Sequence, residues 1–431
     1  MNHRKIFGAR LTALVCVLAF GPACPLPCPA ATAGETNQVL TLRQALALAL
    51  ERSPELAVFP HELRALEARE LQAGLRPNPE LGVTVENVLG TGTVRAFRGA
   101  ETTLQLGQLI ELGGKRLARV EAVAGERQVA AAEYEVKRAG LLADTAGAFI
   151  RVLAAQEAAR LAKERVELAR KIAATTAELV TAGKISPVEA TRARAQVAAA
   201  RIEAERAGHT LNGEKARLVA HWGDREARFV SVWGAVDEEM VIPEFAAMAA
   251  RLEQNPTLRR WLAELARRQA EVSLTEARRT PDVTVSGGLR ELSGPDDRAF
   301  VLGLSVPLPF NNRNQGAREE ARQRVKAGEA ERTAAATRLF AELRATHESL
   351  LAASSEAAAL AKEILPASEQ TLAAIMEGYT SGKFGYLDVL EAQRALFAAK
   401  EQRLRAQAAV HLLVAELERL LGAPLNPPSA Q

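Results

Sequence analysis

Thr181-Ala182-Gly183-Lys184 returns 199 residues later in the chain as Thr380-Ser381-Gly382-Lys383. Four further landmarks recur in the same order, within four residues of that offset. They are Gly113-Gly114-Lys115 with Asn311-Asn312-Arg313, Trp222-Gly223 with Leu421-Gly422, Pro54 with Pro256, and Pro79 with Pro281. This pattern indicates duplication of a unit of about 180 residues, far longer than a solenoid repeat. We expect two similar halves, each a large assembly of secondary structure.

Each copy contains a stretch predicted to form one very long helix. Residues 115–180 include no proline and are dominated by Ala, Glu, Arg, Leu and Val. At about 1.5 Å per residue such a helix spans about 100 Å. The counterpart, residues 313–379, is equally long, and Pro366 should bend it locally. Helices of this length exceed a single globular domain and need coiled-coil-like partners.

The partners are predicted within the same copy. A helix returns over residues 188–221 after the turn at Gly183, and another over 387–421 after the turn at Gly382. Each return helix covers about half of its long helix, so a shorter helix that precedes the strands must cover the rest. The non-helical segment from Gly223 to Ile242 then connects the copies near mid-length.

Proline and capping signals place the shorter helices. Thr41 and Gln44 fit a capping box at a helix start. Ser53-Pro54 fits the start of a second helix that runs to about Leu75 and is kinked at Pro60. The second copy shows the equivalent signals at Pro243 and at Asn255-Pro256, with helix to about Arg279.

Between the shorter helix and the long helix, each copy carries two segments with period-two alternation, which is typical of strands. The alternating apolar residues are Leu81, Val83, Val85, Val283, Val285, Leu302, Leu304, Val306 and Leu308, and residues 103–112 are a less regular partner. Loops at 90–99 and 293–298 make each pair a hairpin. The strands have about ten residues, enough to cross a bilayer when tilted. The alternative is two ordinary hairpins packed on the helices.

The first 33 residues read as an export signal. Arg4, Lys5 and Arg10 form a basic segment, residues 11–20 an apolar one, and Ala31-Thr32-Ala33 a cleavage site. Lipidation at Cys24 is an alternative that Gly21-Pro22-Ala23 matches poorly. We divide the chain into a signal (1–33), a first repeat (34–223), a connector (224–242), a second repeat (243–422) and an irregular tail (423–431).

Composition narrows the class of protein. All three cysteines (Cys16, Cys24 and Cys28) lie in the signal, which excludes disulfides and cysteine chemistry from the mature chain. Without the three basic residues of the signal the chain holds 52 basic and 52 acidic residues, so nothing favours a nucleic-acid partner. No apolar run of 18 residues follows the signal, which leaves a periplasmic protein or one that crosses an outer membrane on strands.

From about Leu40 to Gly422 this pattern resembles the TolC family of outer-membrane efflux channels, and within it the heavy-metal (CzcC-like) branch. The segments that carry the resemblance leave the two hairpins and the second tip: Gln108-Leu109-Ile110-Glu111-Leu112-Gly113-Gly114-Lys115-Arg116, Val306-Pro307-Leu308-Pro309-Phe310-Asn311-Asn312-Arg313-Asn314-Gln315-Gly316, and Gly378-Tyr379 with Gly382-Lys383 and Tyr386-Leu387-Asp388-Val389-Leu390-Glu391-Ala392-Gln393. The resemblance implies a mainly α fold with four transmembrane β-strands per chain. It implies a homotrimer with a 12-stranded β-barrel in the outer membrane and a helical tunnel in the periplasm.

Physical reasoning supports pooled strands independently. Four strands do not close a barrel, so a single copy leaves open edges. In lipid each unpaired N–H or C=O group on such an edge costs on the order of several kcal/mol. Neighbouring copies must therefore contribute strands. Only a trimer of a duplicated unit gives a six-fold-like ring of hairpins that is wide enough for solute.

The resemblance also implies functional positions at the hairpin tips. Asp388 and Glu391, three residues apart on one helix face, match the carboxylates that ring the narrow periplasmic end of the tunnel. Glu189 and Tyr379 match an acidic residue and a tyrosine that the family often bonds to each other there. The more ordinary interpretation is that acids favour helix N-termini.

The turns at both tips match those that family members present to a periplasmic membrane-fusion adaptor, which links the channel to an inner-membrane RND-type pump. The residues are Gly183, Lys184, Gly382 and Lys383. Both glycines also fit helix C-caps. A lysine after each glycine departs from the multidrug members, which puts a multidrug adaptor in doubt.

No other chemistry is visible in the sequence. The histidines of the mature chain are widely spaced, so no metal site or cofactor is expected, and no enzyme motif is present. The resemblance, and not any set of ligands in the sequence, implies a passive exit duct for heavy-metal cations. The alternatives are a duct for drugs or for secreted proteins, and, in a different class, a periplasmic coiled-coil adaptor or scaffold without a channel.

Overall fold

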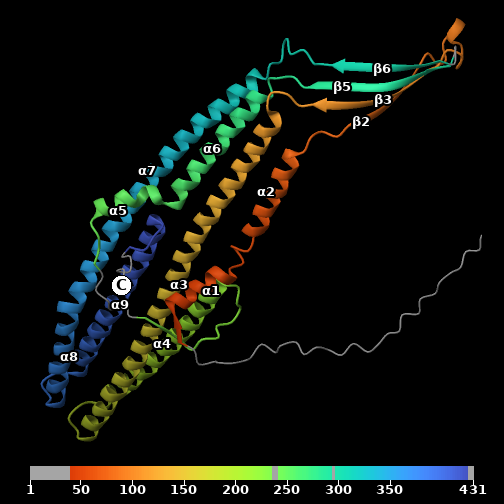
Figure 1. Ribbon diagram of the computed structural model, residues 1–431. Helices are drawn as coiled ribbons and strands as arrows, with labels where there is room; N and C mark the ends of the chain where they lie inside the picture. The colour runs from red at the N-terminus through yellow and green to blue at the C-terminus, as the bar shows by residue number, and fades with distance from the viewer. Residues whose placement is uncertain (1–38, 235–240, 294–296, 426–431) are drawn as a thin grey trace, which may run out of the picture.

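The computed structural model describes residues 39–234, 241–293 and 297–425. The predicted signal, part of the connector and most of the tail lie outside the described residues. A long helical bundle has the strands at one end and two hairpin tips at the other (Figure 1).

The elements follow one order twice. The first copy contains β1 (Val39–Thr41), α1 (Leu42–Arg52), α2 (Phe59–Gly74), β2 (Glu80–Glu86), β3 (Glu101–Ile110), α3 (Lys115–Thr181) and α4 (Pro187–Ala220), and β4 (Ser231–Trp233) follows. The second contains α5 (Phe245–Arg251), α6 (Pro256–Ala277), β5 (Val283–Leu292), β6 (Asp297–Ser305), α7 (Gln315–Ala359), a π-helical turn (Leu360–Ile364), α8 (Leu365–Thr380) and α9 (Tyr386–Leu421).

The predicted long helices are confirmed. Helix α3 is continuous over 67 residues. Its counterpart is interrupted where the sequence predicts, because the π-helical turn directly precedes Pro366 in the first turn of α8. A proline has no N–H to donate and its ring crowds the preceding turn, so a widened turn is a natural place to absorb it.

The starts of the shorter helices are predicted correctly except in one case. Thr41 and Gln44 form the capping box, and Asn255 caps α6 by accepting from the N–H groups of Thr257 and Leu258. In the first copy, however, α2 begins at Phe59 and not at Pro54. Pro60 therefore lies in the first turn, where its fixed φ suits a helix, and it does not kink α2.

The two predicted hairpins join into one antiparallel sheet in the order β2-β3-β5-β6. The link is the pairing of β3 with β5, from Ile110 opposite Val283 to Glu101 opposite Leu292. Strand β6 ends at Ser305, so the expected continuation to Leu308 is wrong: Pro307 and Pro309 have no N–H for a ladder. A parallel pair of short strands, β1 and β4, was not predicted.

One face of the sheet is apolar and exposed. On this face, apolar residues lie directly opposite one another on adjacent strands: Leu81 and Leu106, Val83 and Leu104, Leu104 and Leu289, and Leu289 and Phe300. The exposed apolar side chains on this face include Leu81, Val83, Val85, Leu104, Leu106, Val285, Leu289, Phe300, Leu302 and Leu304. The opposite face carries glycines and polar groups, including a hydrogen bond from Gln105 to Ser286. A contiguous apolar surface of this extent marks an interaction with lipid or protein.

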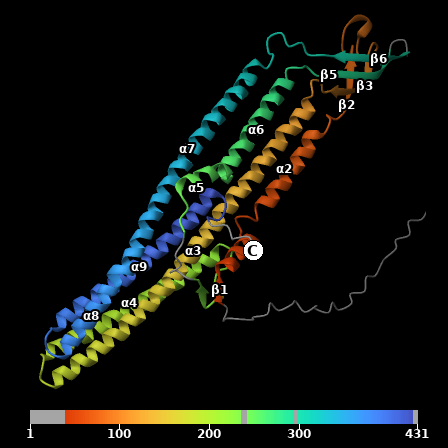
Figure 2. The same ribbon diagram turned by 60° about the vertical axis from the view of Figure 1, so that its left-hand side comes forward.

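The shorter helices stack along the long ones as predicted. Helix α3 contacts α2 toward the sheet and α4 toward the tip, while α6 packs between α3 and α7 (Figures 1 and 2). Near the tips α3 contacts both α4 and α9, and α9 in turn contacts α8. In the described parts of the chain, no helix is both long and apolar enough to span a membrane.

Two glycines allow α6 to approach both long helices. A Cβ on Gly125 of α3 would lie 3.0 Å from Cα of Arg267, and one on Gly328 of α7 would lie 2.9 Å from Cδ2 of Leu265. Both contacts would be tighter than ordinary packing. The absence of a side chain at these positions therefore sets how closely the three helices pack.

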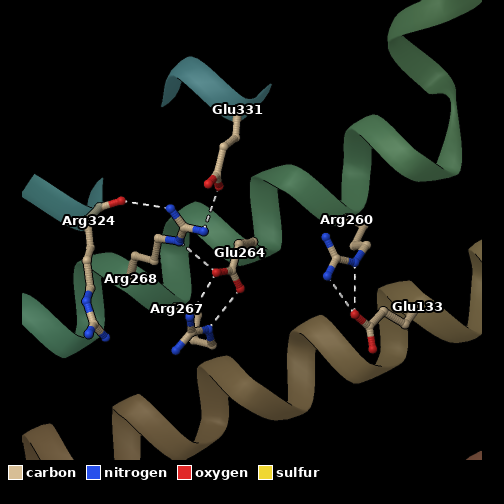
Figure 3. Close-up of polar contacts among 7 residues, drawn as sticks. All are labelled: Glu133, Arg260, Glu264, Arg267, Arg268, Arg324 and Glu331. Carbon is tan, nitrogen blue, oxygen red and sulfur yellow. Dashed lines mark hydrogen bonds and ion pairs between the residues drawn. The ribbon is translucent and has the colours of Figure 1, made fainter. Parts of the chain in front are cut away.

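A charged cluster fixes the same junction (Figure 3). Glu264 is almost fully buried and accepts from Arg267, at 2.9 and 2.8 Å, and from Arg268, at 2.7 Å. Arg268 also donates to Glu331 and to the carbonyl of Arg324 on α7, both at 2.8 Å. The hydrogen bonds from Arg267 and Arg268 outweigh burial and lower the pKa of Glu264 to about 2.

This cluster predicts an acid-sensitive contribution to stability. Because the pKa of Glu264 is lowered on folding, its stabilisation is present above about pH 4.5 and is lost as the pH falls toward 2. Glu264→Gln should lower the free energy of unfolding by about 3 kcal/mol at pH 7 and much less at pH 2. Urea unfolding of the protein in detergent measures the free energy of unfolding at pH 7 and at pH 2. Glu205→Gln, at an exposed glutamate of α4, is the control. A difference between wild type and Glu264→Gln that stays constant from pH 7 to pH 2 contradicts the assignment.

Candidate functional site

The two tips end in the same turn. At the end of α3 the N–H of Lys184 donates to Leu179 O at 2.9 Å and that of Gly183 to Val180 O at 2.9 Å. At the end of α8, Lys383 donates to Gly378 O and Gly382 to Tyr379 O, at 2.8 and 3.1 Å. This pair of bonds is the Schellman motif. It needs a left-handed residue, which Gly183 (φ 69°) and Gly382 (φ 77°) supply.

The lysines that follow these glycines are exposed at both tips. The structure thus brings Gly183, Lys184, Gly382 and Lys383 to the end of the molecule that lies farthest from the sheet (Figures 1 and 2). The glycines have a structural role as C-caps. The turn leaves both lysine side chains available to a partner.

Beneath the tips a compact core joins the two hairpins. It is formed by Ile172, Leu179, Ala193, Tyr379, Tyr386 and Val389. The hydroxyl of Tyr379 donates to Thr176 Oγ1 at 3.0 Å, and Thr176 donates to Ile172 O at 2.7 Å. Burial is the main cause that raises the pKa of both tyrosines, and the charge of Glu189 adds to it. Both phenols are therefore neutral and hold α8 and α9 against α3.

The bond between Glu189 and Tyr379 that the resemblance implied is not made within the chain. Glu189 Oε1 instead pairs with Arg192 at 3.2 Å. The hydroxyl of Tyr379 meets Thr176, which stands on the facing turn of α3. Tyr379 is only 1% exposed, so it positions helices at the tip and presents no polar group to solvent.

Asp388 and Glu391 lie on the first turns of α9 and both are exposed. Asp388 Oδ2 accepts from the N–H of Gly385 at 2.8 Å and so caps the helix. Asp388 thus has the ordinary role of an acid at a helix N-terminus. One carboxylate oxygen makes that bond, and the group stays exposed beside Glu391.

Sequence reasoning missed Arg192. The 199-residue offset that relates the tips places Glu189 opposite Asp388 and Arg192 opposite Glu391. The first copy therefore carries an ion pair where the second carries two carboxylates. The offset itself was the signal that could have identified Arg192. The net charge of the pair is zero in the first copy (Glu189 and Arg192) and negative in the second (Asp388 and Glu391).

Gly378 makes room for an aromatic side chain at the second tip. A Cβ there would lie 2.3 Å from Cδ2 of Phe384, which folds back over the end of α8. A side chain at position 378 would therefore displace the ring of Phe384.

A metal site was not expected, and the described residues contain no group of three or more His, Cys, Asp or Glu side chains arranged to hold an ion.

Comparison with known proteins identifies the family. The model of the outer membrane efflux protein family matches residues 45–224 and 248–423. The chain belongs to this family. Its members are transport channels of the outer membrane, so the chain is an outer-membrane protein. That it has no enzymatic activity stays a prediction, as do the exact domain boundaries.

Two relatives of this efflux protein carry names that mention metals. It is 34% identical over 383 residues to the cobalt-zinc-cadmium resistance protein CzcC of Cupriavidus metallidurans, a match that covers 89% of this chain and 90% of CzcC. It is 30% identical over 291 residues to the nickel and cobalt resistance protein CnrC of the same organism, 67% of each chain. The crystal structure of CusC matches with a TM-score of 0.75 at 16% identity, covering 89% of this chain and 92% of CusC. The predicted fold class and resemblance are confirmed.

The contact between Gly378 and Phe384 predicts a local effect at the tip of this efflux protein. Gly378→Ala should displace Phe384 and cost about 1–3 kcal/mol, the range for overpacking. Hydrogen exchange of residues 375–390 should become faster. Gly140→Ala in α3 is the matched control, because its Cβ would meet nothing within 4 Å and alanine favours helix. Equal exchange in both variants contradicts the packing role.

Proposed function

We propose that three copies of this efflux protein form the exit duct of a tripartite export system that carries heavy-metal cations out of the cell. The observation that carries the proposal is the four-stranded sheet, with an exposed apolar face and free edges at β2 and β6. In lipid the apolar face is favourable, but an open edge is not, since its N–H and C=O groups find no partner.

Three copies resolve the edge problem. Their sheets together supply twelve strands, with β6 of each copy beside β2 of the next. The outward face would be the apolar one and the inward face the one with glycines and polar side chains. Such a barrel leaves a lumen, whereas about eight strands leave an interior just wide enough for side chains.

The helices support a continuation of this lumen. Because the same helical arrangement occurs twice per chain, three copies place six similar hairpins around one axis. At the tips, Asp388 and Glu391 would contribute six exposed carboxylates, while Glu189 is paired with Arg192. A ring of carboxylates attracts cations and repels anions. We propose Asp388 and Glu391 as the charged lining of the constriction, with Tyr379 and Glu189 behind it.

The class of substrate follows from the relatives and this charge together. CzcC and CnrC are named for resistance to divalent metal ions, and the chain spans nine tenths of CzcC. The described residues contain no cluster of side chains that would hold a metal tightly, which suits a duct that ions must leave. The energy would come from an inner-membrane RND-type pump, reached through a periplasmic adaptor that contacts Gly183, Lys184, Gly382 and Lys383.

Conductance of the purified trimer in planar bilayers tests the duct. The wild type should prefer cations, and Asp388→Ala/Glu391→Ala should lose most of that preference, because six charges leave the narrowest ring. Glu203→Ala/Glu205→Ala removes two acids of α4 away from the tip and should leave the preference unchanged. Cation preference that is unaffected by the first double variant removes these residues from the filter. A protein that never conducts overturns the proposed function.

Adaptor docking has a separate test. Lys184→Glu/Lys383→Glu reverses the exposed charge at both tips and should abolish metal resistance of cells while trimer mass and conductance persist. Lys137→Glu/Lys163→Glu, two lysines of α3, is the control and should retain resistance. Full resistance in the tip variant would show that the lysines do not contact the adaptor.

A further inference from the structure

Certain residue pairs join the first repeat to the second within one chain. We infer that the residues at the equivalent positions, taken with the two repeats exchanged, join each copy to the next. The inferred pairs are Glu363 with Arg201 of the partner subunit, Ile364 with Ile202 of the partner subunit, and Arg313 with Glu80 of the partner subunit. This inference rests on the proposed trimer and specifies the surfaces that build it.

The template is the contact between repeats within the chain. Helix α3 of the first repeat packs against α9 of the second, and strand β3 pairs with β5. The counterparts of α3 and α9 are α7–α8 and α4. The counterparts of β3 and β5 are β6 and β2, the two free edges. In a ring of equivalent repeats, α8 must therefore meet α4 of the partner subunit as α3 meets α9.

Two ion pairs define the template near the tips. Lys400 Nζ lies 3.8 Å from Glu164 Oε2, and Arg165 NH1 lies 3.9 Å from Glu401 Oε1. The 199-residue offset of the tips carries Glu164 to Glu363, and Lys400 back to Arg201. The same offset carries Arg165 to Ile364 and Glu401 back to Ile202.

The counterparts match each other in kind. Glu363 and Arg201 keep opposite charges, are exposed, and form no ion pair within the described residues. Ile364 and Ile202 replace both members of the other pair with apolar side chains that are 47% and 59% exposed. Both members of the charged pair are thus replaced by apolar residues at the equivalent positions. Such a joint replacement is expected where the two side chains touch each other. Contact between the two isoleucines would remove their apolar surface from water.

A third pair lies where the helices meet the sheet. Lys115 Nζ contacts Asp282 Oδ1 at 2.7 Å across the two repeats. The landmarks place Arg313 opposite Lys115, and Glu80, after Pro79, opposite Asp282, after Pro281. Both counterparts are exposed, and neither side chain has an ion pair in the described structure. Glu80 begins edge strand β2 and Arg313 follows edge strand β6, so the closing of the sheet between copies brings them together.

Not every contact between the repeats has such a counterpart. Arg260 pairs with Glu133 at 2.7 Å, but Val58 stands opposite Arg260. Here the repeats also differ in structure, because α2 begins only at Phe59. The inferred contacts are thus confined to the junction with the sheet and to the half of the bundle near the tips.

Cysteine cross-linking of the full chain tests the inference, since all native cysteines lie in the first 33 residues. Ile202→Cys/Ile364→Cys should yield covalent dimers and closed trimers on a non-reducing gel, which a reductant dissolves. Each single variant should remain monomeric on the gel. Ile202→Cys/Leu351→Cys is the matched control, because Leu351 is exposed to a similar extent on α7 but lies thirteen positions away from Ile364. Equal cross-linking in the control, or none in the test pair, overturns the inferred register.

Exchanging the charges of the inferred ion pairs is a second test, and it requires no cysteine substitution. Glu363→Arg and Arg201→Glu should each lower the temperature at which the trimer dissociates, and the double variant should recover most of the loss. Glu80→Arg and Arg313→Glu should behave in the same way. If the decrease in dissociation temperature of a double variant equals the sum of the decreases of its two single variants, the two residues are not in direct contact.

Native mass measurement in detergent separates this inference from the proposed function. A trimer that conducts ions but forms no cross-link and shows no recovery defeats the inferred pairs alone. A protein that is monomeric at every concentration defeats the trimer and the inference with it.

Discussion

The unpaired backbone edges of β2 and β6 are the constraint on which the rest of the structure depends. Water satisfies such edges, but lipid does not, and the apolar face formed by residues such as Val83, Leu302 and Phe300 belongs in lipid. The two requirements conflict within one chain and are reconciled when neighbours pair their edges. Enclosing a hole is then a geometric consequence, since a closed sheet of twelve strands cannot fill its own interior.

Duplication makes this closure simple and also leaves room for differences between the copies. The tips use the same turn, with Gly183 and Gly382 in equivalent left-handed positions. Their charges have diverged, because Arg192 neutralises Glu189 whereas Asp388 stands beside Glu391. In the proposed trimer, the ring of six similar hairpins would alternate between neutral and negative positions. The buried cluster around Glu264 and the glycines of α3 and α7 hold α6 rigidly between the long helices, far from this variation.

Much of the fold could be predicted from the sequence because its signals are local and repeated. Proline-free stretches, the Thr41 capping box and alternating strands located the long helices and hairpins closely. The start of α2 was missed because Ser53-Pro54 and Val58-Phe59-Pro60 offer competing starts, and burial of Leu56 in the intervening turn decides between them. The pairing of β1 with β4 joins segments almost 200 residues apart, which no local pattern reveals. At the site, Asp388 and Glu391 were placed by resemblance, but the partner of Tyr379 depends on which helix turn faces it.

The most direct test of the central claim is the structure of the full-length protein in lipid nanodiscs, determined by electron cryo-microscopy. The account predicts three copies with β6 of each hydrogen-bonded to β2 of the partner subunit, the apolar face against lipid and an open axis through the helices. A single copy whose sheet lies folded on its own helices, away from the lipid, would contradict it.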